Sequence, residues 1–226
     1  MRFYVKKNKI NNKKHLQQTA NKRGNIMNTR QMDKFTDHCA KFFDLEPMIM
    51  HTESHMDMHV DVLLFEPNEK YPFWKLVTMG ASDYKMPKTE FSLGDRNEYM
   101  MFVDADEDLT DRFVVDWYYQ QLMNIALMPY KEKFAVSYGH SMEWELEDDE
   151  EMCGCFLEMP QVLEDPSIMR CKLGLFHDVV LLQAILLNKH EIEKLLTVGP
   201  EDFSYYLYPD TGRQHYLSQR RRTSKF

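Results

Sequence analysis

Strand-like and helix-like segments follow one another along this chain without a regular β-α alternation. Strand-like segments are short and rich in apolar residues, and helix-like segments show apolar residues at a spacing of three to four. The predicted strands are 57–65, 73–79, 97–103, 153–159 and 179–187, and the predicted helices are 32–43, 111–127, 189–196 and 200–207. A doubly wound parallel sheet needs a helix after nearly every strand, so this order favours an α+β fold.

The segment 111–127 carries the strongest helical pattern. Asp111 can cap its first turn, and Pro129 is expected to stop it. The apolar residues expected to share one face of this helix are Phe113, Trp117, Leu122, Ile125 and Ala126. The next predicted helix, 189–196, is expected to close at Gly199.

Charge divides the chain into three parts. Residues 1–31 hold nine Lys/Arg and no acid, residues 212–226 hold five Lys/Arg and no acid, and residues 32–211 therefore carry 14 bases against 36 acids, a net charge of -22. We expect one domain at 32–211, with a basic, disordered N-terminal tail (1–31) and a basic C-terminal tail (212–226). A body this acidic repels nucleic acid and anionic membranes and attracts a basic protein partner, although solubility alone also accounts for it.

Cysteine content and hydropathy bear on the compartment. The four cysteines, Cys39, Cys153, Cys155 and Cys171, are too few for a disulfide framework, and no apolar run approaches the length of a membrane span. The basic start has no apolar stretch after it, unlike a secretory signal. We therefore expect a cytoplasmic protein with reduced thiols.

Two groups of residues could bind a metal ion, and neither has a convincing pattern. His51, His55 and His59 would line one face of a helix, but alternation around them places His55 and His59 at the approach to a strand. Cys153 and Cys155 lack the second thiol pair of a zinc site, so they are expected to be core thiols. The sequence predicts no metal and no cofactor.

Catalytic motifs are missing from the sequence. It contains no nucleophile elbow, no phosphate-binding loop, no dinucleotide fingerprint and no H-E-x-x-H motif. Ser82 stands beside Asp83, but no base or oxyanion site can be identified for it, so a capped turn is the preferred interpretation.

An acidic run covers residues 143–151. It lacks the glycine and the alternating spacing of a calcium loop, so we interpret it as a solvated loop or as a contact surface for a basic partner. Its members are Glu143, Glu145, Glu147, Asp148, Asp149, Glu150 and Glu151.

Several motifs in order resemble the suppressor-of-fused domain family. The stretch 55–87, HMDMHVDVLLFEPNEKYPFWKLVTMGASDYKMP, has the family's histidine- and aspartate-bearing strand, its proline turn and its L-V-T-x-G-x-S-D segment. An arginine, an acid and an apolar strand follow at 96–103, then a helix ending in an A-x-x-P turn at 126–129, Gly139-His140, and a closing strand and helix at 180–199. The resemblance spans about 32–207, with Ala81 and the acidic run as departures.

The resemblance implies a mixed, largely antiparallel sheet with helices packed against it, and a non-catalytic protein-binding role. It also implies that signature residues contribute to binding: His59, Asp61, Thr78, Gly80, Ser82, Asp83, Arg96 and Glu98. Animal members are larger and restrain a transcription factor, whereas short bacterial members resemble immunity proteins encoded beside polymorphic toxins.

Three hypotheses for function remain. The first is a bacterial immunity protein that binds and neutralises a basic toxin, and the second is an intracellular scaffold or regulator with another protein partner. The third is an unrecognised hydrolase or metal enzyme that uses His55, His59, Ser82 and Asp83.

Overall fold

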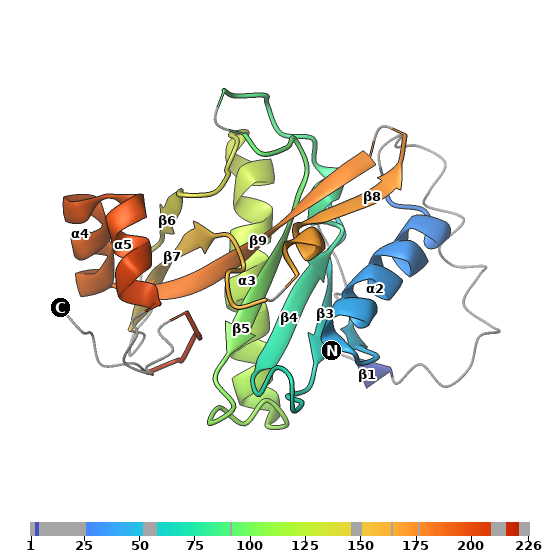
Figure 1. Cartoon of the computed structure of the whole chain (residues 1–226), viewed down its shortest axis with the longest axis horizontal. Helices are drawn as coiled ribbons and strands as arrows, with labels where there is room; N and C mark the ends of the chain where they lie inside the picture. Colours follow the sequence, from blue (N-terminus) through green and yellow to red (C-terminus); the bar gives the residue numbers. More distant parts are fainter. Residues whose placement is uncertain are drawn as a thin grey trace.

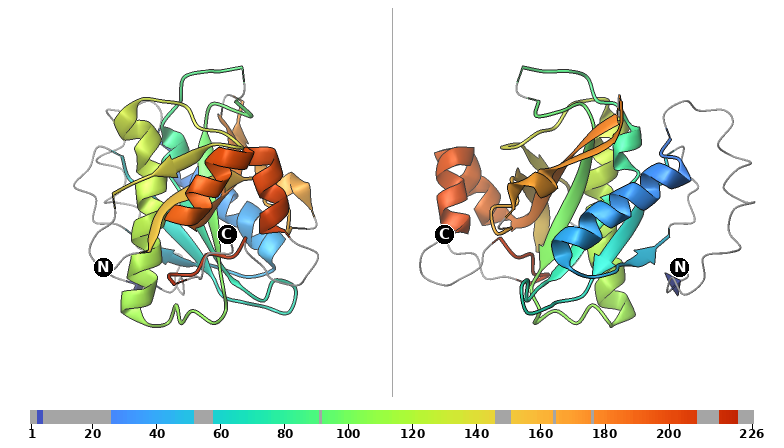
Figure 2. Two further views of the ribbon diagram at one scale, coloured as in Figure 1. Left: turned by 90° about the vertical axis from the view of Figure 1, so that its left-hand side faces the viewer. Right: turned by 45° about the vertical axis from the view of Figure 1, so that its right-hand side comes forward.

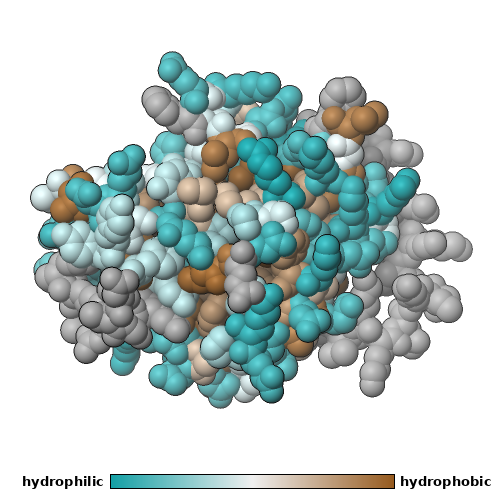
Figure 3. All heavy atoms as spheres, viewed as in Figure 1, coloured by the Kyte–Doolittle hydropathy of each residue, from teal (hydrophilic) through white to brown (hydrophobic). Residues whose placement is uncertain are grey.

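The structure is a computed structural model. It describes residues 3–4, 26–51, 58–90, 92–145, 151–163, 165–175, 177–208 and 216–221. Within these ranges, no helix is long and apolar enough to cross a membrane. The space-filling view shows hydrophilic side chains over most of the visible face, with smaller hydrophobic areas among them (Figure 3).

One mixed sheet organises the described chain (Figure 1). Its path runs β1-β2-β3-β4-β5-β9-β7-β6, and β8 pairs with β9 off this path. Only the β5–β9 pair is parallel among the described strands, which confirms the expected α+β class with a largely antiparallel sheet. The strands are β1 (Phe3–Tyr4), β2 (Met48–Met50), β3 (Asp61–Phe65), β4 (Trp74–Met79), β5 (Asn97–Val103), β6 (Ser141–Glu143), β7 (Met152–Glu158), β8 (Arg170–Gly174) and β9 (His177–Asn188).

Helices cover both faces of this sheet (Figure 2). The helix α3 (Arg112–Glu132) packs into one apolar cluster, and α2 (Thr29–Phe43) packs into a second cluster on the other face. The pair α4 (Lys189–Val198) and α5 (Pro200–Leu207) covers the end formed by β7 and β9, with a third cluster beneath it. Two 3-10 turns, η2 (Ala81–Asp83) and η3 (Pro166–Met169), complete the elements.

The helix α3 corrects two predictions. Asp111 caps it as expected, accepting a hydrogen bond from the Phe113 N–H, but the helix continues through Pro129 to Glu132. Proline removes one backbone hydrogen bond, and burial of Pro129 on the packed side of the helix offsets that loss. Phe113 does not share the buried face, because its side chain is 85% exposed. Leu122, Ile125 and Ala126 are buried as predicted, and Trp117 is partly buried.

The start of β3 differs from the predicted strand 57–65. The strand begins at Asp61, and His59 and Val60 precede it in irregular backbone. Gly80 explains the interruption, since a Cβ on that residue would lie 2.3 Å from the His59 carbonyl oxygen. The backbone of residues 59–60 and the backbone of Gly80 therefore lie too close together for the regular hydrogen-bond pattern of paired strands.

The chain joins this body before residue 32 and again after residue 211. The helix α2 starts at Thr29, where Asn28 and Gln31 form a reciprocal capping box, and Met27 is buried. Near the other end, Ser218 is fully buried and forms a bridge with Val103. Its N–H donates to the Phe102 carbonyl at 2.7 Å and its hydroxyl accepts from the Leu186 N–H at 3.2 Å, so it links β5 to β9.

Candidate functional site

The signature segment forms a tight turn at the end of β4. Gly80 has φ of +119°, a conformation that residues with a side chain rarely adopt, and the 3-10 turn η2 follows directly. The turn leaves three successive N–H groups without partners in the strand ladder. Such a row of backbone donors forms a concave site for an anion.

The carboxylate of Glu98 fills this concave site. Its Oε1 accepts from the N–H groups of Gly80 and Ser82 at 2.8 and 2.9 Å, and its Oε2 accepts from the Ala81 N–H at 3.2 Å and the Thr78 hydroxyl at 2.6 Å. Glu98 is fully buried, and this burial raises the pKa of its carboxyl, while its hydrogen bonds with Thr78, Ser82 and Gly80 oppose the rise. The buried side chain of Glu98 therefore holds the turn from within, at the place where an external anion would bind.

Arg96 holds the other side of the same turn. Its Nη1 donates to the carbonyl oxygens of Ser82 and Asp83 at 2.6 and 3.3 Å, and the side chain is 5% exposed. Glu98 thus satisfies the donors of the turn and Arg96 satisfies its acceptors. Arg96 directly precedes β5 and Glu98 is the second residue of that strand. Since side chains two residues apart in an extended chain point to the same face, both can brace one turn.

Asp83 connects the turn to the start of α2. Its Oδ1 accepts a hydrogen bond from the Met27 N–H at 2.7 Å. Burial raises the pKa of this carboxyl to about 7, with the Met27 hydrogen bond acting in the opposite direction. This contact was missed from the sequence, because Met27 lies in a segment that was expected to be a tail.

A second polar group lies where β2 and β3 meet. Asp61 is 1% exposed, and its Oδ1 lies 3.0 Å from His51 Nδ1 and 2.9 Å from His59 Nε2. The hydrogen bond to Asp61 raises the pKa of His59, although burial lowers it in part. Burial would raise the pKa of Asp61, but its contacts with the two histidines hold it below the usual value.

The structure brings His51 and His59 together at Asp61. The sequence analysis weighed a helical row of three histidines and preferred a strand approach for His55 and His59. His51 lies opposite Asp61 in the β2–β3 register, which runs Met48↔Leu64, Ile49↔Leu63 and Met50↔Val62. His59 precedes Asp61 by two residues, and His55 lies outside the described residues. His51 meets Asp61 because of the pairing register of β2 and β3, and the spacing of residues along the sequence does not predict that register.

The signature residues are mostly internal. Thr78, Ser82 and Glu98 are fully buried, and Asp61 and Arg96 are almost fully buried. A side chain without exposed surface makes no direct contact with a partner, so direct binding by these residues stays a prediction that requires movement. For the same reason the Ser82 hydroxyl is inaccessible to a substrate, which weakens the hydrolase hypothesis.

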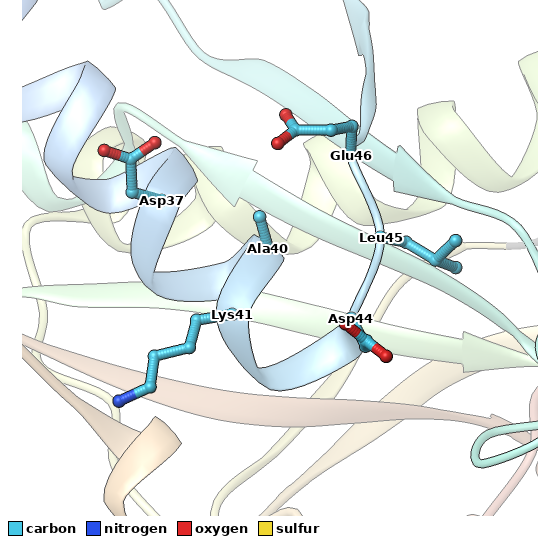
Figure 4. Close-up of a pocket in the computed structure, with 6 residues that line it drawn as sticks. All are labelled: Asp37, Ala40, Lys41, Asp44, Leu45 and Glu46. Atoms are coloured by element: carbon cyan, nitrogen blue, oxygen red, sulfur yellow. The ribbon is translucent and has the colours of Figure 1, made fainter.

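The acidic run is only partly described. Glu143 ends β6, and Glu143, Glu145 and Glu151 are exposed, while Glu147, Asp148, Asp149 and Glu150 lie outside the described residues. A further acidic surface lies at the C-terminal end of α2. There a surface pocket is lined by Asp37, Ala40, Lys41, Asp44, Leu45 and Glu46 (Figure 4), and its three acidic residues are exposed.

The cysteines form no thiol site in the described residues. All four are buried as separate free thiols. Burial raises the pKa of Cys155 to about 12 and of Cys171 to about 11, and it also raises the pKa values of Cys39 and Cys153. This agrees with the interpretation of Cys153 and Cys155 as core residues.

Comparisons with known proteins give one consistent result. The family model described as "Suppressor of fused protein (SUFU)" matches residues 56–217. No curated protein sequence matches the chain.

Three solved structures share the fold. The crystal structure of the Sufu–Fu complex aligns with a TM-score of 0.62 at 11% identity, covering 86% of this chain and 91% of that one. A suppressor-of-fused homologue from Neisseria gonorrhoeae aligns with a TM-score of 0.58 at 14% identity, covering 87% of this chain and 97% of that one. Drosophila Suppressor of Fused aligns with 0.64 at 11%, covering 86% of this chain and 51% of that one.

Proposed function

The chain belongs to the suppressor of fused family, and from this premise we propose that it acts by binding another protein, namely a basic toxin that it neutralises as an immunity protein. The domain of this family is a protein-interaction domain, and one of the similar structures is a complex of Sufu with Fu. Binding of this kind needs a rigid surface and no catalytic group. The proposal that this partner is a basic toxin depends on the charge of the chain.

The observation that carries the proposal is the net charge of -22 over residues 32–211. A field of this sign accelerates encounter with a basic protein and discourages association with nucleic acid. Nucleases are basic because their substrate is anionic, so a toxin of that type offers the complementary charge. Tight association with it would block its substrate site without any chemistry by the immunity protein.

The α4–α5 pair is the surface that we assign to this contact. It exposes Leu196 (72%) and Tyr205 (79%), and it also carries the exposed acids Glu193, Glu201 and Asp202. The pair also carries Lys189 and Lys194, so acids exceed bases on it without excluding them. Exposed aromatic and aliphatic side chains surrounded by charged side chains are typical of interface centres and their rims. A basic partner can bury the apolar side chains while its cations pair with the surrounding carboxylates.

The test begins with a search for a toxin gene next to the gene for this chain. Co-expression of the two in a bacterial host is expected to restore growth, and the purified proteins are expected to elute as one complex. Replacing Leu196 and Tyr205 by Glu is expected to abolish both effects, because it places unpaired charge in the contact and removes the apolar side chains. Phe113→Glu is the matched control, since Phe113 is an exposed apolar residue on a different helix.

Growth arrest despite normal expression, together with separate elution of the two proteins, would refute the immunity role. If the chain instead captures a chromosomal protein and no toxin gene lies nearby, the scaffold or regulator hypothesis is favoured. This second candidate is supported by the similar structure in which Sufu is bound to Fu.

A further inference from the structure

His51, His59 and Asp61 form a group of three side chains of the types that bind metal ions. Two imidazole nitrogens from different segments converge on one carboxylate oxygen, and all three candidate ligand atoms lie within 4.8 Å of one another. It is the one such group found among the described residues. From this convergence we propose that His51, His59 and Asp61 form a binding site for a divalent transition-metal ion such as Zn²⁺.

The distances between the ligand atoms suit a common metal ion. Nitrogen and oxygen ligands bind zinc in a tetrahedron at about 2.0–2.2 Å, so two neighbouring ligand atoms of one ion stand about 3.3–3.6 Å apart, a few tenths of an ångström more than in a hydrogen bond. The observed separations are 3.0 Å for His51 Nδ1 and 2.9 Å for His59 Nε2, each measured to Asp61 Oδ1. Small side-chain rotations would therefore place an ion among them.

The ligand types also suit such an ion. Two imidazoles and one carboxylate form a donor set that zinc and other first-row transition metals use, whereas calcium and magnesium prefer oxygen ligands alone. A neutral imidazole can move its proton to the other ring nitrogen and offer a lone pair to the metal. The set leaves at least one coordination position for water or for a group of a partner protein.

The surroundings give an ion access to the site and fix the ligands. His51 is 45% exposed and His59 is 42% exposed, so the site opens to solvent on the histidine side. Asp61 is buried and begins β3, and its carbon skeleton is fixed by the β3–β4 pairing of Asp61 with Met79. A bound ion would join the end of β2 to the beginning of β3.

Metal titration of the full chain tests this site. The purified, chelator-treated protein is titrated with ZnCl₂ by calorimetry and with CoCl₂ by visible absorption. We expect one equivalent of Zn²⁺ to bind and Co²⁺ to give the absorption bands of a site with nitrogen ligands. His51→Gln and His59→Gln are each expected to weaken Zn²⁺ binding by at least about tenfold, since loss of a direct ligand exceeds the usual effect of a supporting residue.

His190→Gln is the matched control. His190 is an exposed histidine on α4, 71% exposed and 3.7 Å from Glu193, so its replacement removes an imidazole away from the proposed site. This variant is expected to bind Zn²⁺ as the wild type does, and Zn²⁺ is expected to raise Tm in both but not in the His51→Gln/His59→Gln double variant. Either no Zn²⁺ binding by the wild type or undiminished binding by the double variant would overturn the proposal.

Discussion

The Glu98 carboxylate and the Thr78 hydroxyl are joined by a 2.6 Å hydrogen bond, and both side chains are fully buried. Thr78 Oγ1 also accepts the Tyr99 N–H at 2.8 Å, so the threonine hydroxyl links the carboxylate to the backbone of β5. The same carboxylate accepts three N–H groups of the turn after β4. We therefore expect the stability of this turn to depend on the one buried carboxyl group of Glu98.

Replacing Glu98 tests that dependence. Glu98→Ala leaves the turn donors without partners, and each buried unsatisfied group costs about 1–3 kcal/mol. Glu98→Gln keeps one acceptor oxygen but turns an NH₂ group toward a donor, so it is expected to lie between the alanine variant and the wild type. Urea denaturation measures the order, with Glu69→Gln at an exposed position as the control. Equal stability of all four proteins would contradict the assigned role.

Gly80→Ala is expected to be more harmful than Gly199→Ala. Both glycines have positive φ, +119° and +86°, so alanine is strained at either position by about 1–3 kcal/mol. At Gly80 the new Cβ also meets the His59 carbonyl oxygen at 2.3 Å, whereas at Gly199 it meets no atom within 4 Å. Thermal unfolding compares the two variants, and a larger loss for Gly199→Ala would argue against the close approach at Gly80.

Asp83 gives a pH dependence of known sign. Its folded-state pKa of about 7 lies above the ordinary value of 3.8, so the folded protein binds more protons between these values. The contribution of Asp83 to the free energy of unfolding is therefore expected to fall as the pH rises from about 4 to about 7. Asp83→Asn keeps an oxygen for the Met27 N–H and removes the titration. Its denaturation midpoint should fall less over that range than that of the wild type, and Asp202→Asn should behave like the wild type.

The contact of Ser218 with β5 and β9 predicts a role for the C-terminal segment in holding these strands. Truncation after residue 215 removes the hydrogen bonds of Ser218 and the Arg220–Glu107 ion pair at 3.0 Å. Hydrogen exchange is expected to become faster at the Asp104 and Leu186 amides, which donate to Ser218. Truncation after residue 221 keeps these contacts and serves as the control; equal exchange in both proteins would exclude the role.

The buried thiols should react slowly in the folded protein. At neutral pH the thiolate fraction falls about tenfold for each unit by which the pKa rises, and burial raises the pKa of Cys155 to about 12. Reaction with a disulfide reagent is expected to be much faster in denaturant than in buffer. Rapid modification of any described cysteine in the native state would show that the interior opens readily.

Local pattern was sufficient for most elements. The segments 97–103 and 200–207 have the predicted bounds, and Gly199 closes the helix α4 as predicted. Prediction from local pattern was wrong where tertiary packing outweighs the local preference of a residue. The helix α3 passes through Pro129, and Phe113 is exposed although it is apolar, because the orientation of a helix depends on what it packs against.

By itself the sequence determined the kinds and order of the nine predicted elements, the acidic balance of residues 32–211 and the family, since periodicity, charge and motif order can be read along the chain. It did not predict β1, β2, β6 and β8. Only the tertiary structure decided which polar groups meet: Glu98 with the turn at 80–82, His51 with Asp61, and Ser218 with Phe102. These partners are far apart in the chain or depend on strand register. A one-residue shift of register would move every side chain to the other face, and no local pattern reports that register.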